Sequence, residues 1–169
     1  MRSSKSFPER LPSRTPSKTI SRYLPLIAWM VFISFASTGN FSAGNTSRII
    51  VPLVLWLFPD TSPEAMLAIH GVTRKIAHLA EYALLGILAA RAFRGSPRQA
   101  LRDRWFLVSL ALVIVYALAD EYHQSFVPSR TGTIYDSLID MVGGFAALIF
   151  VWRRDWFSVP RRRASNSPV

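Results

Sequence analysis

An apolar segment long enough to cross a lipid bilayer constrains the fold of this chain more than any other feature. Residues 105–118 carry no charged side chain, and the segment continues to about Phe126. A transmembrane helix needs about 20 residues, because each residue adds ~1.5 Å and the hydrocarbon core is ~30 Å thick. Other apolar segments follow the same pattern. The sequence therefore predicts four spans, at residues 23–37, 74–93, 105–126 and 134–152.

The composition agrees with a small integral membrane protein. Hydrophobic residues make up 50% of the chain, and the charged residues are concentrated outside the apolar segments. A formal net charge of +10 is also typical of soluble nucleic-acid binders, but such proteins are less hydrophobic than this chain. We therefore predict membrane lipids, and no nucleic acid, as partners. The chain has no cysteine, which excludes disulfides and thiolate metal sites.

The distribution of basic residues predicts the orientation in the membrane. Residues 1–22, 91–104 and 153–169 together contain sixteen of the 20 Lys and Arg residues. Under the positive-inside rule, these segments face the cytoplasm. We therefore predict a bacterial inner-membrane protein with both termini cytoplasmic and an uncleaved first span. Two basic tails, residues 1–22 and 155–169, have a composition typical of flexible segments and flank one membrane domain, residues 23–154.

The connection between the first two spans, residues 38–73, is long for a helix bundle. Its apolar run, residues 49–58, includes Pro52 and is too short to cross the bilayer. We predict that this run and residues 63–70 form two short helices at the membrane interface, which cap the outer end of the bundle. The predicted fold class is an all-α, integral membrane four-helix bundle with a capping extracytoplasmic loop.

Small residues recur at a spacing of four within two of the predicted spans. Gly86 and Ala90 form one pair, and Gly143 and Ala147 form the other. This spacing allows close backbone contact between helices in lipid. We interpret both pairs as ordinary helix packing.

Polar side chains gather at the outer ends of three predicted spans. Arg74, His78 and Glu81 follow helical spacing and share one face of the second span. The third and fourth spans repeat this pattern. Ionisable groups at membrane depth usually face a bundle interior or an aqueous cavity, because exposing them to lipid is costly. The predicted binding site comprises Arg74, Lys75, His78, Glu81, Tyr82, Asp120, Glu121, Gln124, Arg130, Asp136 and Asp140.

Two interpretations of this cluster use its cations. Arg74, Lys75 and Arg130 could pair with the carboxylates and hold the helices in register, because an unpaired buried charge is far costlier than a paired one. The same cations could instead bind a phosphate or carboxylate of a cell-envelope or lipid-linked molecule. We favour the anionic ligand and keep the structural network in a partner-binding membrane protein as an alternative.

A third interpretation is an intramembrane enzyme. His78 with Glu81, and His123 with Asp120 and Glu121, could supply a general base or share a metal. The sequence contains no HExxH, GxSxG or phosphate-loop motif that would support this interpretation. We therefore predict no catalytic residues, no metal and no cofactor.

Three motifs in this region resemble those of the VanZ-like membrane proteins. Residues 74–86, RKIAHLAEYALLG, resemble the family's RKxxHxxEYxxLG segment, and residues 120–130 resemble its DExxQxxxPxR segment. Asp136, Asp140 and Gly143 resemble DxxxNxxG, with Asp140 where asparagine is usual. The family is named for a protein associated with low-level teicoplanin resistance. The resemblance therefore raises glycopeptide resistance or envelope homeostasis as a role, which similarity of fold alone does not establish.

Overall fold

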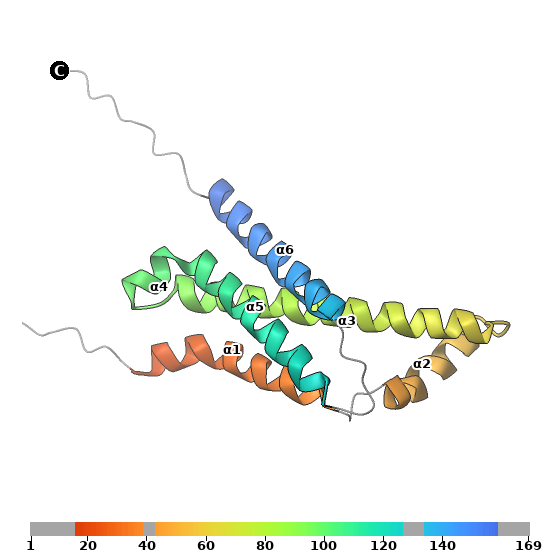
Figure 1. Ribbon diagram of the computed structural model, residues 1–169. Coiled ribbons are helices and arrows are strands. Elements are labelled where there is room, and N and C mark those ends of the chain that lie inside the picture. The colour runs from red at the N-terminus through yellow and green to blue at the C-terminus, as the bar shows by residue number, and fades with distance from the viewer. Residues whose placement is uncertain (1–15, 39–42, 127–133, 159–169) are drawn as a thin grey trace, which may run out of the picture.

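The computed structural model describes residues 16–38, 43–126 and 134–158, and these residues form α-helices joined by short turns (Figure 1). The all-α prediction is confirmed for this part of the chain, in which no strand occurs. The helices are α1 (Pro16–Ala36), α2 (Ala43–Leu57), α3 (Pro63–Arg94), α4 (Gln99–Asp103), α5 (Trp105–Gln124) and α6 (Ile134–Ser158).

The central helix is α3, which contacts α1, α5 and α6 (Figure 1). The hydroxyl of Tyr23, in the first half of α1, donates to Ser96 Oγ, just beyond the end of α3, at 3.0 Å. At the other end of α1, Ser37 Oγ accepts a hydrogen bond from Gln124 Nε2, at the end of α5, at 3.4 Å. Helices α1 and α5 therefore run in one direction, opposite to α3.

Helix α6 runs in the same direction as α3 and crosses it at glycines. A Cβ atom on Gly86 of α3 would lie 2.8 Å from the carbonyl oxygen of Gly144 in α6. A Cβ atom on Gly143 would overlap the carbonyl oxygen of Leu79. Only glycine allows two helix backbones to approach so closely. The packing role predicted for Gly86 and Gly143 is confirmed.

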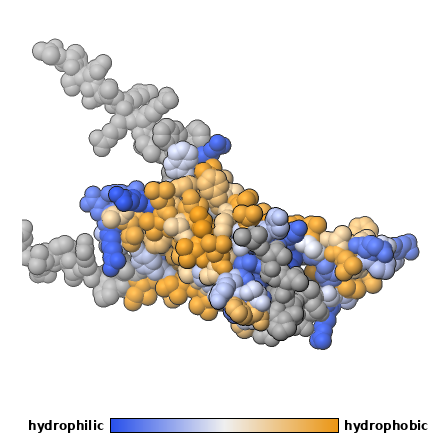
Figure 2. All heavy atoms as spheres, in the orientation of Figure 1, coloured by the Kyte–Doolittle hydropathy of each residue, from blue (hydrophilic) through white to orange (hydrophobic). Residues whose placement is uncertain are grey.

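The apolar side chains divide into a small core and a large outer surface. Ile33, Tyr82, Leu85 and Val113 are buried where α1, α3 and α5 meet. Many other large hydrophobic side chains are exposed along the helices, and Figure 2 shows a broad hydrophobic area with hydrophilic residues near α4. An apolar surface of this extent suits a lipid environment better than water.

Three of the four predicted spans correspond to helices that are long and apolar enough to cross a membrane. These segments are Pro63–Arg94, Trp105–Gln124 and Tyr135–Arg154. The described apolar part of α1, Ile20–Ala36, is shorter. The structure therefore supports three spans.

Two predicted helix boundaries were wrong. Residues 63–70 do not form a separate short helix, because they are the first turns of α3. Ser62 caps this helix by accepting a hydrogen bond from the backbone N–H of Ala65, and Pro63 follows in the first turn, which suits a helix start. Helix α1 begins at Pro16, seven residues before the predicted start of the first span at residue 23.

Candidate functional site

Gln124 joins two charged residues at one end of the helix assembly. Its side chain is fully buried, at 0% exposure. The amide Nε2 donates to Asp120 Oδ2 at 2.9 Å, and Oε1 accepts from Arg74 Nη2 at 3.1 Å. An amide can do both, because it carries donor and acceptor atoms. Gln124 thus connects an arginine of α3 to a carboxylate of α5.

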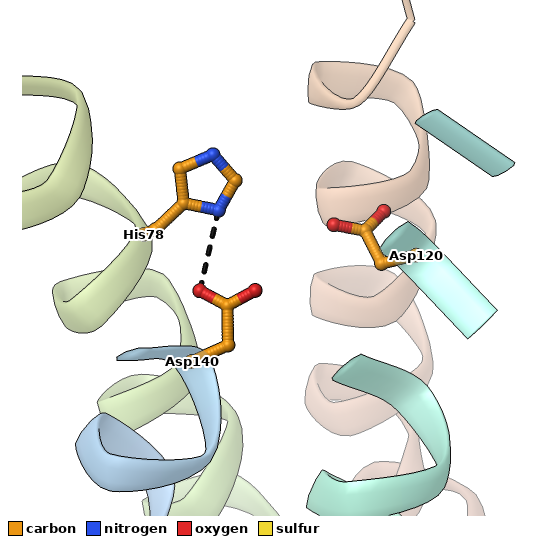
Figure 3. Close-up of side chains that lie close together, drawn as sticks. All are labelled: His78, Asp120 and Asp140. Atoms are coloured by element: carbon orange, nitrogen blue, oxygen red, sulfur yellow. Dashed lines mark ion pairs between the residues drawn. The ribbon is translucent and has the colours of Figure 1, made fainter. Parts of the chain in front are cut away.

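His78 and Asp140 form a second polar contact in the same region. His78 Nδ1 of α3 lies 3.3 Å from Asp140 Oδ1 of α6, and both side chains are buried (Figure 3). Asp120 belongs to the same group, because His78, Asp120 and Asp140 can each place one nitrogen or oxygen atom within 4.8 Å of the other two. One residue from each of α3, α5 and α6 therefore meets at this point. We call these three residues the buried triad.

Aromatic residues tie α1 to the helices that carry the buried triad. Trp29 Nε1 donates to the carbonyl oxygen of Glu81 at 2.9 Å. The hydroxyl of Tyr116 donates to the carbonyl oxygen of Met30 and lies 2.6 Å from Ser34 Oγ. Each of these bonds crosses between helices, so they fix α1 against α3 and α5.

A small, partly open pocket of about 170 Å³ lies beside the buried triad, where α3 meets the start of α6. Its lining residues are Arg74, Lys75, His78, Asp136 and Ile139. Lys75 is exposed and Arg74 is half-buried, so both cations are accessible from the pocket. His78 lines the pocket and also belongs to the buried triad. The two polar features therefore share one side chain.

The structure brings most of the predicted site residues together. Arg74, Lys75, His78 and Asp136 line the pocket. Gln124 bonds to Arg74 and to Asp120, and Asp140 contacts His78, so these three residues are linked to the pocket wall. Ser37, which sequence reasoning missed, also bonds to Gln124. A lone serine after an apolar run gives no sequence signal for such a contact.

Other predicted residues stand apart or have different roles. Tyr82 is buried and donates from its hydroxyl to the carbonyl oxygen of Tyr116 at 3.4 Å. Glu121 is half-buried on α5. His123, the second histidine of the enzyme interpretation, is exposed and outside the buried triad. Arg130 lies outside the described residues.

A family model described as VanZ/LLP1 matches residues 22–157, which include every residue of the pocket and of the buried triad. No curated protein and no solved structure matches the chain significantly.

Proposed function

This chain belongs to the VanZ/LLP1 family, and we propose that it is a membrane protein that binds an anionic group in the pocket beside Arg74 and Lys75. The observation that carries the proposal is the position of these two cations on the pocket wall. Arg74 gives one N–H to Gln124. A guanidinium has five N–H donors in a planar fork, which suits a phosphate or carboxylate.

The surroundings of the pocket favour an amphiphilic ligand. Val72, Ile76 and Leu79 on α3 and Leu138 on α6 are exposed apolar residues that flank the pocket residues in sequence. A molecule with an anionic head and a hydrocarbon tail could place its head at Arg74 and Lys75 and its tail along these side chains. This chemistry fits a cell-envelope or lipid-linked molecule. Such a ligand would connect the protein to envelope homeostasis, of which glycopeptide resistance is one outcome.

A purely structural role is the second candidate, and the bonds from Arg74 through Gln124 to Asp120 favour it. In this role the charged residues hold the helices in register and bind no ligand. The two candidates differ at Lys75, because its exposed side chain lines the pocket and lies outside that chain of bonds. A ligand site needs Lys75, whereas the structural network does not.

Binding of farnesyl phosphate to the detergent-purified protein tests the anionic-ligand proposal, with farnesol as the uncharged comparison. We expect the phosphate to bind and farnesol to bind much more weakly. Lys75→Gln should lower the affinity for farnesyl phosphate by about tenfold or more, because a hydrogen bond to a charged group contributes roughly 1.5–3 kcal/mol. Thermal stability should stay close to that of the wild type.

Arg91→Gln is the matched control, because Arg91 is also an exposed cation of α3 but lies in its last turn. This substitution should leave binding unchanged. Equal binding of farnesyl phosphate and farnesol, or equal losses in the two variants, would contradict a specific anion site and favour the structural role.

We also propose that α1 is a fourth span, so that both termini lie on the cytoplasmic side of the bacterial inner membrane. Its apolar part, Ile20–Ala36, is about 26 Å long at ~1.5 Å per residue, close to the ~30 Å of the hydrocarbon core. Helix α1 contacts Ser96, just after α3, through Tyr23, and Gln124, at the end of α5, through Ser37. It therefore extends alongside the neighbouring spans from one end of the assembly to the other. The five arginines of residues 91–104, between the last turn of α3 and the start of α5, support the orientation.

Single-cysteine labelling tests this topology, and the absence of cysteine from the natural chain removes background labelling. Asp60→Cys, in the exposed turn between α2 and α3, should react with a membrane-impermeant maleimide in intact spheroplasts. Arg98→Cys, between α3 and α4, and Ser3→Cys should react only after lysis. Labelling of Arg98→Cys from outside would reverse the orientation, and labelling of Ser3→Cys alone from outside would remove α1 as a span.

A further inference from the structure

We propose that the buried triad of His78, Asp120 and Asp140 binds a divalent transition-metal cation of the zinc type. This site is separate from the anion pocket, although His78 takes part in both. The proposal also departs from the sequence interpretation, which predicted no metal and grouped the histidines with neighbours in their own helices. The structure instead groups one histidine with two carboxylates from two other helices.

The spacing of the buried triad suits a metal ion. His78 Nδ1 and Asp140 Oδ1 are 3.3 Å apart. Two ligands of a tetrahedral zinc ion with bonds of about 2.0 Å lie roughly 3.3 Å from each other, since a tetrahedral edge is about 1.6 times the bond length. Each of the three residues offers an atom within 4.8 Å of the others.

The state of Asp140 is a second and independent observation. Its side chain is 1% exposed; Oδ1 has only the ion pair with His78 Nδ1 at 3.3 Å, and Oδ2 has no hydrogen-bond partner among the described residues. The carboxylate points toward the space between His78 and Asp120 (Figure 3). A buried carboxylate oxygen without a hydrogen bond is unfavourable, and native proteins usually give such an atom a donor or a metal ion. A divalent cation would satisfy Asp140 and balance the charges of both carboxylates.

Hydrogen bonds from neighbouring side chains hold one member of the buried triad, Asp120, in place. Gln124 bonds to Asp120 Oδ2 and is itself held by Arg74. Outer groups of this kind orient the ligands of metal sites and contribute to affinity. His78 also lines the pocket, so the buried triad lies directly beside it.

The donor atoms indicate the class of metal. Imidazole favours zinc and its transition-metal neighbours, whereas carboxylates alone would favour magnesium or calcium. Three protein ligands leave the fourth position of a tetrahedral zinc ion for water or for an atom of a bound molecule, as in catalytic zinc sites. Zinc is therefore the first ion to test, with manganese and magnesium as comparisons.

Metal content of the full-length protein tests the proposal. The detergent-purified chain is stripped with EDTA, incubated with zinc chloride, desalted, and measured for zinc by mass spectrometry. We expect about one zinc ion per chain. Asp140→Asn should lower zinc affinity by roughly 10–100-fold or more. Loss of a residue that only orients a metal ligand already has an effect of this size, and Asp140 would be a ligand itself. Asp120→Asn should have the same effect.

Two controls keep the result interpretable. Asp140→Asn keeps the size of the side chain and introduces the residue usual in the VanZ-like motif, so the variant should fold; size-exclusion chromatography and helical circular dichroism check this. His123→Ala removes an exposed histidine outside the buried triad and should leave zinc binding unchanged. Three results would each overturn the proposal: no zinc retained by the wild type, equal zinc in Asp140→Asn and the wild type, or loss of zinc in His123→Ala.

Discussion

Gly143→Ala should force α6 away from α3 and lower the thermal stability of the purified protein. The new Cβ atom would overlap the carbonyl oxygen of Leu79, which belongs to a helix backbone and cannot rotate aside as a side chain does. Overpacking of this kind costs about 1–3 kcal/mol and occasionally more. Thermal unfolding of the detergent-solubilised protein, followed by circular dichroism, measures the effect. The shift of α6 should also draw Asp140 away from His78.

Gly71→Ala provides the matched control for this substitution. Gly71 lies within the same helix, α3, but a Cβ atom there meets nothing within 4 Å. Alanine is favoured over glycine inside a helix by roughly 0.5–1 kcal/mol, so this variant should be as stable as the wild type or slightly more stable. If Gly143→Ala unfolded at the same temperature as Gly71→Ala, the backbones of α3 and α6 would not approach as closely as described.

Gln124→Leu should destabilise the protein by removing the amide between Arg74 and Asp120. Leucine has a similar size but neither donates nor accepts hydrogen bonds. The substitution would leave Asp120, which is buried, without the donor at 2.9 Å, and Arg74 without its acceptor. Each stranded polar group costs about 1–3 kcal/mol, and more when it is charged. We expect a clear drop in unfolding temperature and in the yield of monodisperse protein.

His123→Leu is the neighbouring control, because the exposed His123 precedes Gln124 on a different face of α5. It introduces the same leucine at the same end of the helix and should change stability little. Similar losses in both variants would mean that the end of α5 tolerates no leucine. Full stability of Gln124→Leu would show that the bonds to Arg74 and Asp120 do not support the fold.

The sequence predicted the helices where one physical requirement dominates. The uncharged run from Trp105 must be helical if it lies in a bilayer, because lipid offers no partners for its backbone groups. The predicted span at 105–126 and the observed α5, Trp105–Gln124, agree closely for this reason. Hydropathy does not show whether two helical segments join outside the apolar region. The sequence therefore predicted a helix at residues 63–70 but not its continuation into the span at 74–93.

Helical spacing predicted which polar residues share a face but not which residues meet across helices. His78 and Glu81 are three residues apart, so they were grouped as neighbours on one helix. The observed partner of His78 is Asp140. That pairing depends on where α6 crosses α3, and the backbone approach at Gly86 and Gly144 sets the crossing. One sequence shows that such glycines permit close packing but not which helix supplies the partner.

The length of α3 affects how a molecule would reach the pocket. Its 32 residues extend about 48 Å, well beyond the ~30 Å of hydrocarbon in a bilayer. Arg74 lies eleven residues after Pro63, about 17 Å along the axis from the start of α3. The pocket would then sit near head-group depth, below the projecting end of α3. A lipid-like molecule would arrive sideways by diffusion within the leaflet, so its concentration in the membrane, and not in the surrounding water, would govern occupancy.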